Sequence, residues 1–162
     1  MKIILKGEPI SQGRMRVTTI GGFARLYDPC AKHKSALREQ IANYVKDNYP
    51  EFKMLEHPRI SFIFHMPIPK SIKKRDAVKY NSGLLKHEKK SDCDNLVKLS
   101  LDCLDGIVFQ GDEKVSLGNC VKLYHREPKT IIFLTEEDSL LCQRELEPQL
   151  WTYLCSTESD ES

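Results

Sequence analysis

The chain has 162 residues and a formal net charge of +2 at pH 7, with 40% hydrophobic and 30% charged residues. This composition is typical of one folded globular domain and excludes a disordered or collagen-like chain. No apolar run approaches the roughly 20 residues that a membrane span needs, and the first residues lack a signal-peptide pattern, so we expect a cytoplasmic protein that does not enter a membrane.

The beginning of the chain predicts three short strands. Lys2–Lys6 is a short β-rich run. Two further strand-like runs, residues 15–18 and 23–27, flank Gly21-Gly22. A glycine pair between two such runs predicts a β-hairpin.

A long helix and a strand are predicted next. Asp28 suits the N-cap position and Pro29 the first helical position. The helix is expected to run to about Asn48, because apolar residues recur there at spacings of three and four: Ala36, Leu37, Ile41, Tyr44 and Val45. The alternating run Pro58–Met66 that follows predicts a strand.

Residues 70–90 form a basic segment, in which eight lysines and arginines stand against two acidic residues. We expect a short helix near residues 71–80. Such an excess of positive charge is typical of surfaces that bind phosphate backbones, and the alternative is a solvated face. The residues to which we assign backbone binding here are Lys70, Lys73, Lys74, Arg75, Lys89 and Lys90. Arg14 and Arg16 near the hairpin are assigned the same role, with exposed strand-end cations as the alternative.

The second half of the chain predicts one more helix and three strands. Asp94–Asp105 has a wide apolar face, and Gly106 suits the position after the helix end. Ile107–Phe109, Lys114–Tyr124 and Thr130–Leu134 are the expected strands. Together these elements predict the α/β (α+β) class: a single compact domain with a small mixed, mostly antiparallel sheet packed with two main helices.

We place this domain at residues 1–135. Residues 136–162 contain eight acidic residues and one arginine. They predict an acidic C-terminal extension, helical over about residues 137–155 and disordered after that. Its role stays open between an interaction segment and a shield over the basic surface.

Two aspartates, Asp92 and Asp94, stand one residue apart where the second helix begins. Residues two apart in an extended segment face the same way, so both side chains can bind one ligand. Lys98 lies one helical turn beyond Asp94. If the residues after the helix return along it as a strand, they bring Asp112 to the level of the pair.

Three carboxylates are the hard oxygen ligands that Mg²⁺ or Mn²⁺ prefers. Beside a basic segment, such a site indicates phosphodiester hydrolysis, with Lys98 stabilising charge on the phosphate. The alternative is structural: Asp92 or Asp94 caps the helix, Asp94 and Lys98 form an ordinary ion pair, and Asp112 is a turn residue.

The run Asp92-Cys93-Asp94-Asn95-Leu96-Val97-Lys98 is followed by Asp102-Cys103-Leu104-Asp105-Gly106 and by Gly111-Asp112. With these residues the chain resembles the RusA family of Holliday junction resolvases. Weaker matches are Pro9, Gln12-Gly13-Arg14, Arg16, Tyr27-Asp28-Pro29, Val115 and Lys122-Leu123-Tyr124. The resemblance covers about residues 5–135.

The resemblance implies a RusA-like fold and a homodimeric endodeoxyribonuclease that depends on Mg²⁺, with Mn²⁺ as a substitute. Such enzymes resolve four-way junction DNA by paired symmetric cuts in recombination and repair. The positions carried over are the metal ligands Asp92, Asp94 and Asp112, with Lys98 as the accompanying catalytic lysine. Phe23 and Tyr27 are candidates to stack on bases at a junction, with core packing as the alternative.

One departure from the family pattern affects the site. The family has an acidic pair where this chain has Gly111-Asp112, so the first acidic residue is missing, and we align Asp112 with the second. Two alternatives therefore stay open: a catalytically weakened protein that binds junctions or other branched DNA, and a nuclease that acts on flaps or forks.

Overall fold

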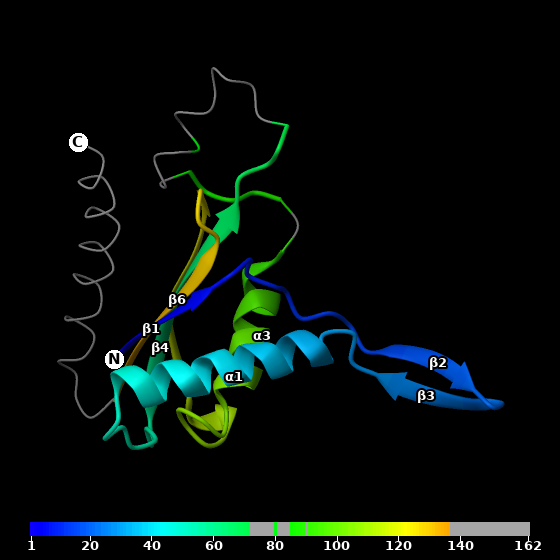
Figure 1. Ribbon diagram of the computed structural model, residues 1–162, viewed down its shortest axis with the longest axis horizontal. Coiled ribbons are helices and arrows are strands. Elements are labelled where there is room, and N and C mark those ends of the chain that lie inside the picture. The colour runs from blue at the N-terminus through cyan, green and yellow to red at the C-terminus, as the bar shows by residue number, and fades with distance from the viewer. Residues whose placement is uncertain (72–79, 81–84, 90, 137–162) are drawn as a thin grey trace.

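The computed structural model describes residues 1–71, 80, 85–89 and 91–136. A sheet in the order β1-β6-β4-β5 forms the centre of the fold (Figure 1). Its strands are β1 (Lys2–Lys6), β4 (Pro58–Pro67), β5 (Ser116–His125) and β6 (Lys129–Glu136). β6 pairs antiparallel with both β1 and β4, whereas β4 pairs parallel with β5. The expected mixed, mostly antiparallel sheet is confirmed.

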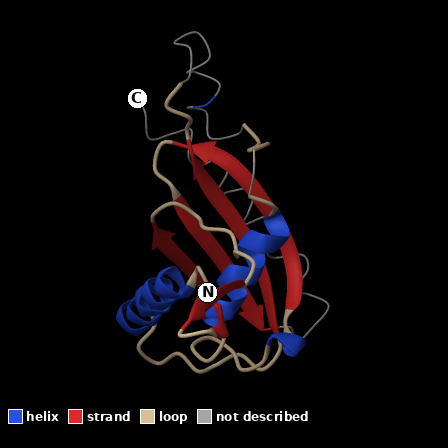
Figure 2. Ribbon diagram, turned by 90° about the vertical axis from the view of Figure 1, so that its right-hand side faces the viewer, coloured by secondary structure: helices blue, strands red, loops and turns tan. Residues whose placement is uncertain are grey.

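Two helices, α1 (Ala31–Asn48) and α3 (Cys93–Leu104), pack against each other and against the sheet (Figure 2). Apolar side chains from both helices and from alternate positions of the strands form the main core; among them are Ile3, Ile41, Phe62, Phe64, Leu96, Leu99 and Leu104. Because β4 and β5 are parallel neighbouring strands, the chain between them has to cross over, and α3 is part of this crossover connection. This packing places the beginning of α3, where the predicted site lies, beside β5.

The central strand β4 is buried on both sides. Ile60, Phe62 and Phe64 belong to the main core. Ile63, one position out of phase with them, packs in a second cluster with Leu123, Ile131 and Phe133. Because successive side chains of a strand point to opposite faces, the two clusters lie on opposite faces of the sheet.

The first helix begins later than expected. α1 starts at Ala31 with Cys30 in the N-cap position, and no side chain caps it. Asp28 instead accepts a hydrogen bond of 2.8 Å at Oδ1 from the backbone N–H of Cys30. This contact two residues along the chain is a turn typical of aspartate, so Asp28 shapes the approach to the helix.

The expected hairpin is confirmed as β2 (Arg16–Ile20) and β3 (Phe23–Tyr27), which form a sheet of their own. Gly21 and Gly22 have φ angles of +60° and +84° in its turn, a combination that favours glycine. Figure 1 shows the hairpin projecting away from the rest of the molecule, beyond the first turn of α1.

Two expectations for the second half need correction, and two others are not tested. The expected strand 107–109 is not formed: residues 106–108 form a turn, in which Gly106 N–H donates to the Phe109 carbonyl at 2.8 Å, and Phe109 makes isolated β-bridges with Leu55 and Asp105. Lys114 belongs to a short 3-10 helix, η2 (Asp112–Lys114), so β5 begins two residues later. The helix expected at 71–80 falls almost wholly, and the extension 137–162 entirely, outside the described residues. No helix in the described part is long and apolar enough to cross a membrane.

Candidate functional site

The predicted carboxylate pair lies exposed at the beginning of α3. Asp92 is the N-cap residue of this helix, and its backbone carbonyl accepts the hydrogen bond of Leu96 N–H at 3.1 Å. Its carboxylate makes no capping hydrogen bond. Asp94 lies in the first turn, and in the described part of the chain it forms no ion pair with Lys98. The side-chain cap and the ordinary ion pair are therefore not formed, and both carboxylates remain available to a ligand.

The backbone just before the pair is held in an uncommon conformation. Ser91 has a φ of +108°, a region that residues with a side chain rarely adopt. Lys122, which extends from β5, donates a hydrogen bond of 2.6 Å to the Ser91 carbonyl. Lys122 thus fixes the direction in which the chain enters α3, and positions Asp92. The sequence match included Lys122 but carried no signal of this role, because its contact depends on the β5–α3 packing.

Asp112 does not join the pair within one chain. Gly111 N–H donates to Asp105 Oδ1 at 2.9 Å, which holds η2 next to the last residues of α3 (Figure 1). The 12 residues of α3 span about 18 Å, so Asp112 and the pair belong to opposite ends of the helix. Over the described residues, no group of three His, Cys, Asp or Glu side chains is arranged to hold a metal ion.

The physical reason is the turn after α3. We expected the residues following the helix to return along it as an extended strand, but residues 106–108 form a turn directly after the helix and η2 follows. A turn gains little distance per residue compared with a strand. The exposed Asp112 carboxylate therefore stays near the C-terminal end of α3.

Gly111, which replaces the first acidic residue of the family pair, has a conformation that suits glycine. Its φ is +86°, and a Cβ at this position would collide with the carboxylate of Glu113. The Glu113 side chain is flexible and can move away, but the backbone strain of an L-residue would remain. The missing acidic residue is thus linked to the shape of this turn.

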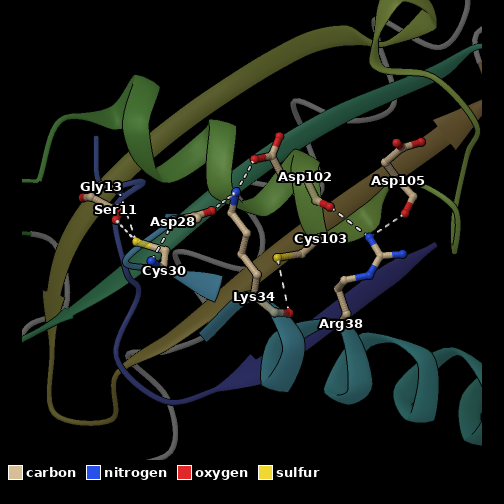
Figure 3. Close-up of polar contacts among 9 residues, drawn as sticks. All are labelled: Ser11, Gly13, Asp28, Cys30, Lys34, Arg38, Asp102, Cys103 and Asp105. Carbon is tan, nitrogen blue, oxygen red and sulfur yellow. Dashed lines mark hydrogen bonds and ion pairs between the residues drawn. The ribbon is translucent and has the colours of Figure 1, made fainter. Parts of the chain in front are cut away.

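Asp102, another residue of the family match, has a structural role here (Figure 3). Lys34 on α1 forms ion pairs with Asp102 at 2.7 Å and with Asp28 at 2.9 Å. Burial alone would lower the pKa of Lys34, but the hydrogen bonds to Asp102 and Asp28 raise it above its ordinary value. The hydrogen bond from Lys34, followed by that from the Cys30 backbone, lowers the pKa of Asp28.

Arg38, one turn further along α1, binds the end of α3. Its guanidinium donates to the backbone carbonyls of Asp102 at 3.0 Å and Asp105 at 2.8 Å (Figure 3). Carbonyls in the last turn of a helix lack partners within the helix, so this arginine satisfies two of them. Together, Lys34 and Arg38 fix α3 against α1 and so hold the carboxylate pair in place on the sheet.

Cys93, between the two aspartates, lies beside Cys120 of β5. Burial first, and then the hydrogen bond with the Cys93 thiol, raises the pKa of Cys120 to about 12. Cys120 is therefore protonated at neutral pH and is not a nucleophile. His65 is also unsuited to acid–base chemistry near neutral pH, because burial, then the charges of His125 and Lys129, lower its pKa to about 3.

The described cations assigned to DNA contact are all exposed: Arg14, Arg16, Lys70 and Lys89. Lys73, Lys74, Arg75 and Lys90 lie outside the described residues. Phe23 and Tyr27 are 75% and 43% exposed, so the alternative that they pack in the core is wrong.

A cavity of about 290 Å³ lies between the end of β1, α1 and α3, and none of the predicted site residues lines it. Its walls include Leu5, Pro9, Leu37, Phe64 and Leu99. The carboxylate pair is thus outside this cavity and on the exposed surface of α3, where a large polymer can reach it.

Comparison with known proteins relates the chain to a family and to a curated protein. The family model described as "Endodeoxyribonuclease RusA" matches residues 6–135. A protein of Bacillus subtilis (strain 168), described as "Uncharacterized protein YqaN", is 30% identical over 138 residues, which cover 84% of this chain and 96% of that protein. The family match includes every residue of the predicted catalytic set: Asp92, Asp94, Lys98 and Asp112.

Proposed function

Because the chain belongs to the RusA family of endodeoxyribonucleases, we propose that it is a cytoplasmic Holliday junction resolvase. It cuts four-way DNA by paired, symmetric phosphodiester hydrolysis in recombination and repair. The observation that supports this proposal most strongly is the exposed Asp92–Asp94 pair, whose carboxylates neither cap α3 nor pair with Lys98. Carboxylates left without a structural task suit a catalytic site.

The pair has the donor chemistry for Mg²⁺, or for Mn²⁺ in its place. Enzymes that act on phosphates bind Mg²⁺ through one or two carboxylates, with substrate phosphates and water as the other ligands. We assign Asp92 and Asp94 to this role. A bound ion would supply an activated water and neutralise negative charge on the scissile phosphate.

Lys98 is exposed one turn after Asp94 on α3, so its ammonium group can contact a phosphate that lies against the pair. A fixed cation there stabilises the negative charge that develops during hydrolysis. We assign contacts with the phosphate backbone to the exposed cations Arg14, Arg16, Lys70 and Lys89, together with Lys73, Lys74, Arg75 and Lys90. Binding through such contacts weakens as the salt concentration rises.

We assign Asp112 to the same ligand set through a homodimer. Within one chain Asp112 belongs to the opposite end of α3 from the pair, so a second copy is the way in which it can reach Asp92 and Asp94. A two-fold symmetric enzyme also matches a two-fold symmetric junction, and two equivalent sites account for paired cuts.

The test of the proposed function is cleavage of a labelled four-way junction, with a linear duplex of the same sequence beside it. With Mg²⁺ or Mn²⁺ the protein should place symmetric nicks in the junction only. Asp92→Asn and Asp94→Asn should each reduce the cleavage rate at least about a hundredfold, since a lost ligand weakens metal binding and catalysis. Both should bind the junction as well as the unchanged protein.

The matched control is Asp47→Asn, which removes an exposed carboxylate from the last turn of α1 and should leave cleavage unchanged. Wild-type cleavage by both Asn variants would refute the site. Cleavage of flaps or forks in preference to the junction, measured by substrate competition, would favour the broader nuclease.

A second candidate is a protein that binds branched DNA but has lost full metal affinity. Gly111 in place of an acidic residue favours it, as does the lack of a three-ligand group among the described residues of one chain. Calorimetric titration with Mn²⁺ separates the two: the resolvase should show saturable binding that Asp94→Asn removes, and the binding protein should show none.

A further inference from the structure

The β2–β3 hairpin exposes large apolar side chains that no part of the described chain covers. Every residue of β3 is exposed, and Phe23 and Leu26 are 75% and 69% exposed. A two-stranded hairpin without further packing is only marginally stable in water. A projecting element of this kind, with several exposed apolar residues, marks a contact with another molecule.

The strand register divides the hairpin into two faces of different chemistry. Arg16 pairs with Tyr27 and Thr18 with Arg25, and these pairs share a side with Phe23. We call this side the basic-aromatic face. The opposite side, which we call the apolar face, carries only uncharged side chains: Val17, Thr19, Ala24 and Leu26.

Charge identifies the partner of the basic-aromatic face. Residues 13–27 contain Arg14, Arg16 and Arg25 and no acidic residue. Within the described structure, none of these three arginines forms an ion pair or donates a side-chain hydrogen bond. Unpaired arginines beside exposed aromatic rings are the combination that binds nucleic acids, because the cations neutralise phosphates and the rings stack on bases.

The position of Phe23 defines what this face can detect. Phe23 follows Gly21-Gly22 directly, so it lies at the tip of the projecting hairpin (Figure 1). The π faces of bases are covered by stacking in a continuous duplex, whereas bases next to an open branch point can unstack. An aromatic ring at a tip therefore distinguishes branched DNA from linear DNA without reading its sequence.

We propose that the β2–β3 hairpin is an arm that recognises the branch point of the DNA substrate. Phe23 stacks on an unstacked base there, and Arg16 and Arg25 contact the flanking phosphates. The inference rests on the proposed function in taking branched DNA as the ligand. It adds that selectivity for the branch point comes from this arm, whereas the carboxylate pair is responsible for cleavage.

The experiment compares Phe23→Thr with Leu26→Thr in the full chain. The second variant removes a similarly exposed apolar side chain from the same strand but from the apolar face, and threonine is well tolerated in strands. Affinities for a four-way junction and for a linear duplex of the same sequence are measured without divalent metal. Phe23→Thr should weaken junction binding about tenfold and duplex binding less than twofold. Leu26→Thr should change neither affinity.

A second readout tests the contact directly. With 2-aminopurine beside the branch point, the unchanged protein and Leu26→Thr should alter its fluorescence, and Phe23→Thr should not. Arg25→Gln should reduce the slope of log affinity against log salt concentration by about one, as expected for one lost phosphate contact. Circular dichroism of each variant verifies that it is folded.

The proposal is overturned if folded Phe23→Thr binds the junction like the unchanged protein. It is also overturned if Leu26→Thr weakens binding equally and sediments as a smaller species, since the hairpin would then contact a second copy of the chain. Because binding is measured without cleavage, the two proposals fail separately. A chain that cuts no junction but shows the Phe23→Thr effect refutes the resolvase alone, and a chain that cuts junctions without that effect refutes the arm alone.

Discussion

The aspartates near α3 fall into two groups. Some carboxylates have structural partners, and others have none in the described structure. Asp28 and Asp102 are both engaged by Lys34, whereas Asp92 and Asp94 have no cap or ion pair in the described structure. All four lie in the part of the sequence that matches the family pattern. Their spacing in the sequence does not distinguish candidate metal ligands from structural residues. Only the hydrogen-bond and ion-pair partners show which carboxylates are available to a ligand.

At the same scale, Gly111→Asp tests whether the missing acidic residue can be restored. We expect a loss of about 1–3 kcal/mol in the free energy of unfolding, because Gly111 has φ +86° and ψ 120°, a backbone conformation that residues with a side chain rarely adopt. Urea denaturation measures the change. Gln110→Asp, which adds the same charge at the exposed neighbouring position, should be nearly neutral. A Gly111→Asp protein with unchanged stability and faster cleavage would contradict this account of the turn.

At the scale of elements, α1 and α3 are joined by polar contacts as well as by apolar packing. Lys34 and Arg38 lie one turn apart on α1 and reach the last turns of α3 and the residues next to it. Since the carboxylate pair lies at the other end of the same helix, these contacts set its position relative to the sheet. They belong to the machinery that positions the site, although none of them touches a ligand.

Lys34→Met should lower the thermal unfolding midpoint at pH 7, since it removes the ion pairs with Asp28 and Asp102. The pKa of Asp28 is lowered by folding, so its stabilising contribution is present above its ordinary value of 3.8 and is lost as the pH falls through the folded value. The raised pKa of Lys34 gives a contribution that is present below 10.5 and lost as the pH rises through the folded value.

The midpoints of the variant and of the unchanged protein should therefore differ between about pH 4 and 10 and converge in stronger acid. Lys32→Met, an exposed lysine of the same helix, serves as the control and should show no difference at any pH. A Lys34→Met deficit that is equally large at pH 2 would show that the ion pairs are not its source.

At the scale of the whole molecule, the length of α3 matters most. It places Asp112 at one end of the helix and the carboxylate pair at the other, and the hairpin extends beyond the first turn of α1 (Figure 1). The carboxylate pair, Asp112 and the β2–β3 hairpin thus belong to different parts of the chain's surface. The homodimer that we propose joins the parts.

Mixed dimers test this assembly. Asp94→Asn and Asp112→Asn should each be inactive alone, and a mixture that has exchanged subunits should regain cleavage at one of the two strands. In the mixed dimer one site is composed of an intact pair from one copy and an intact Asp112 from the other. Denaturing gels of the labelled junction detect single nicks. If each copy contained its whole site, both sites of the mixed dimer would lack one ligand and no activity would return.

Patterns of neighbouring residues were enough to predict the elements whose signals are local. The hairpin follows from Gly21-Gly22, the end of α1 at Asn48 and the extent of α3 from apolar spacing, and β4 from alternation, because each depends on neighbouring residues along the chain. The sequence also identified the family, since the run Asp92 to Lys98 and the residues after it are continuous in sequence. The division of the chain at residue 135 stays a prediction.

Features that depend on contacts between residues distant in the sequence are visible only in the three-dimensional structure. The exposure of Phe23 follows from the absence of any described element above the hairpin, and a pattern of apolar residues cannot distinguish that from a core position. The separation of Asp112 from the pair follows from a turn held by Asp105 and Gly111, and the entry into α3 from a lysine on β5. These features arise from packing in three dimensions, and no local periodicity encodes them.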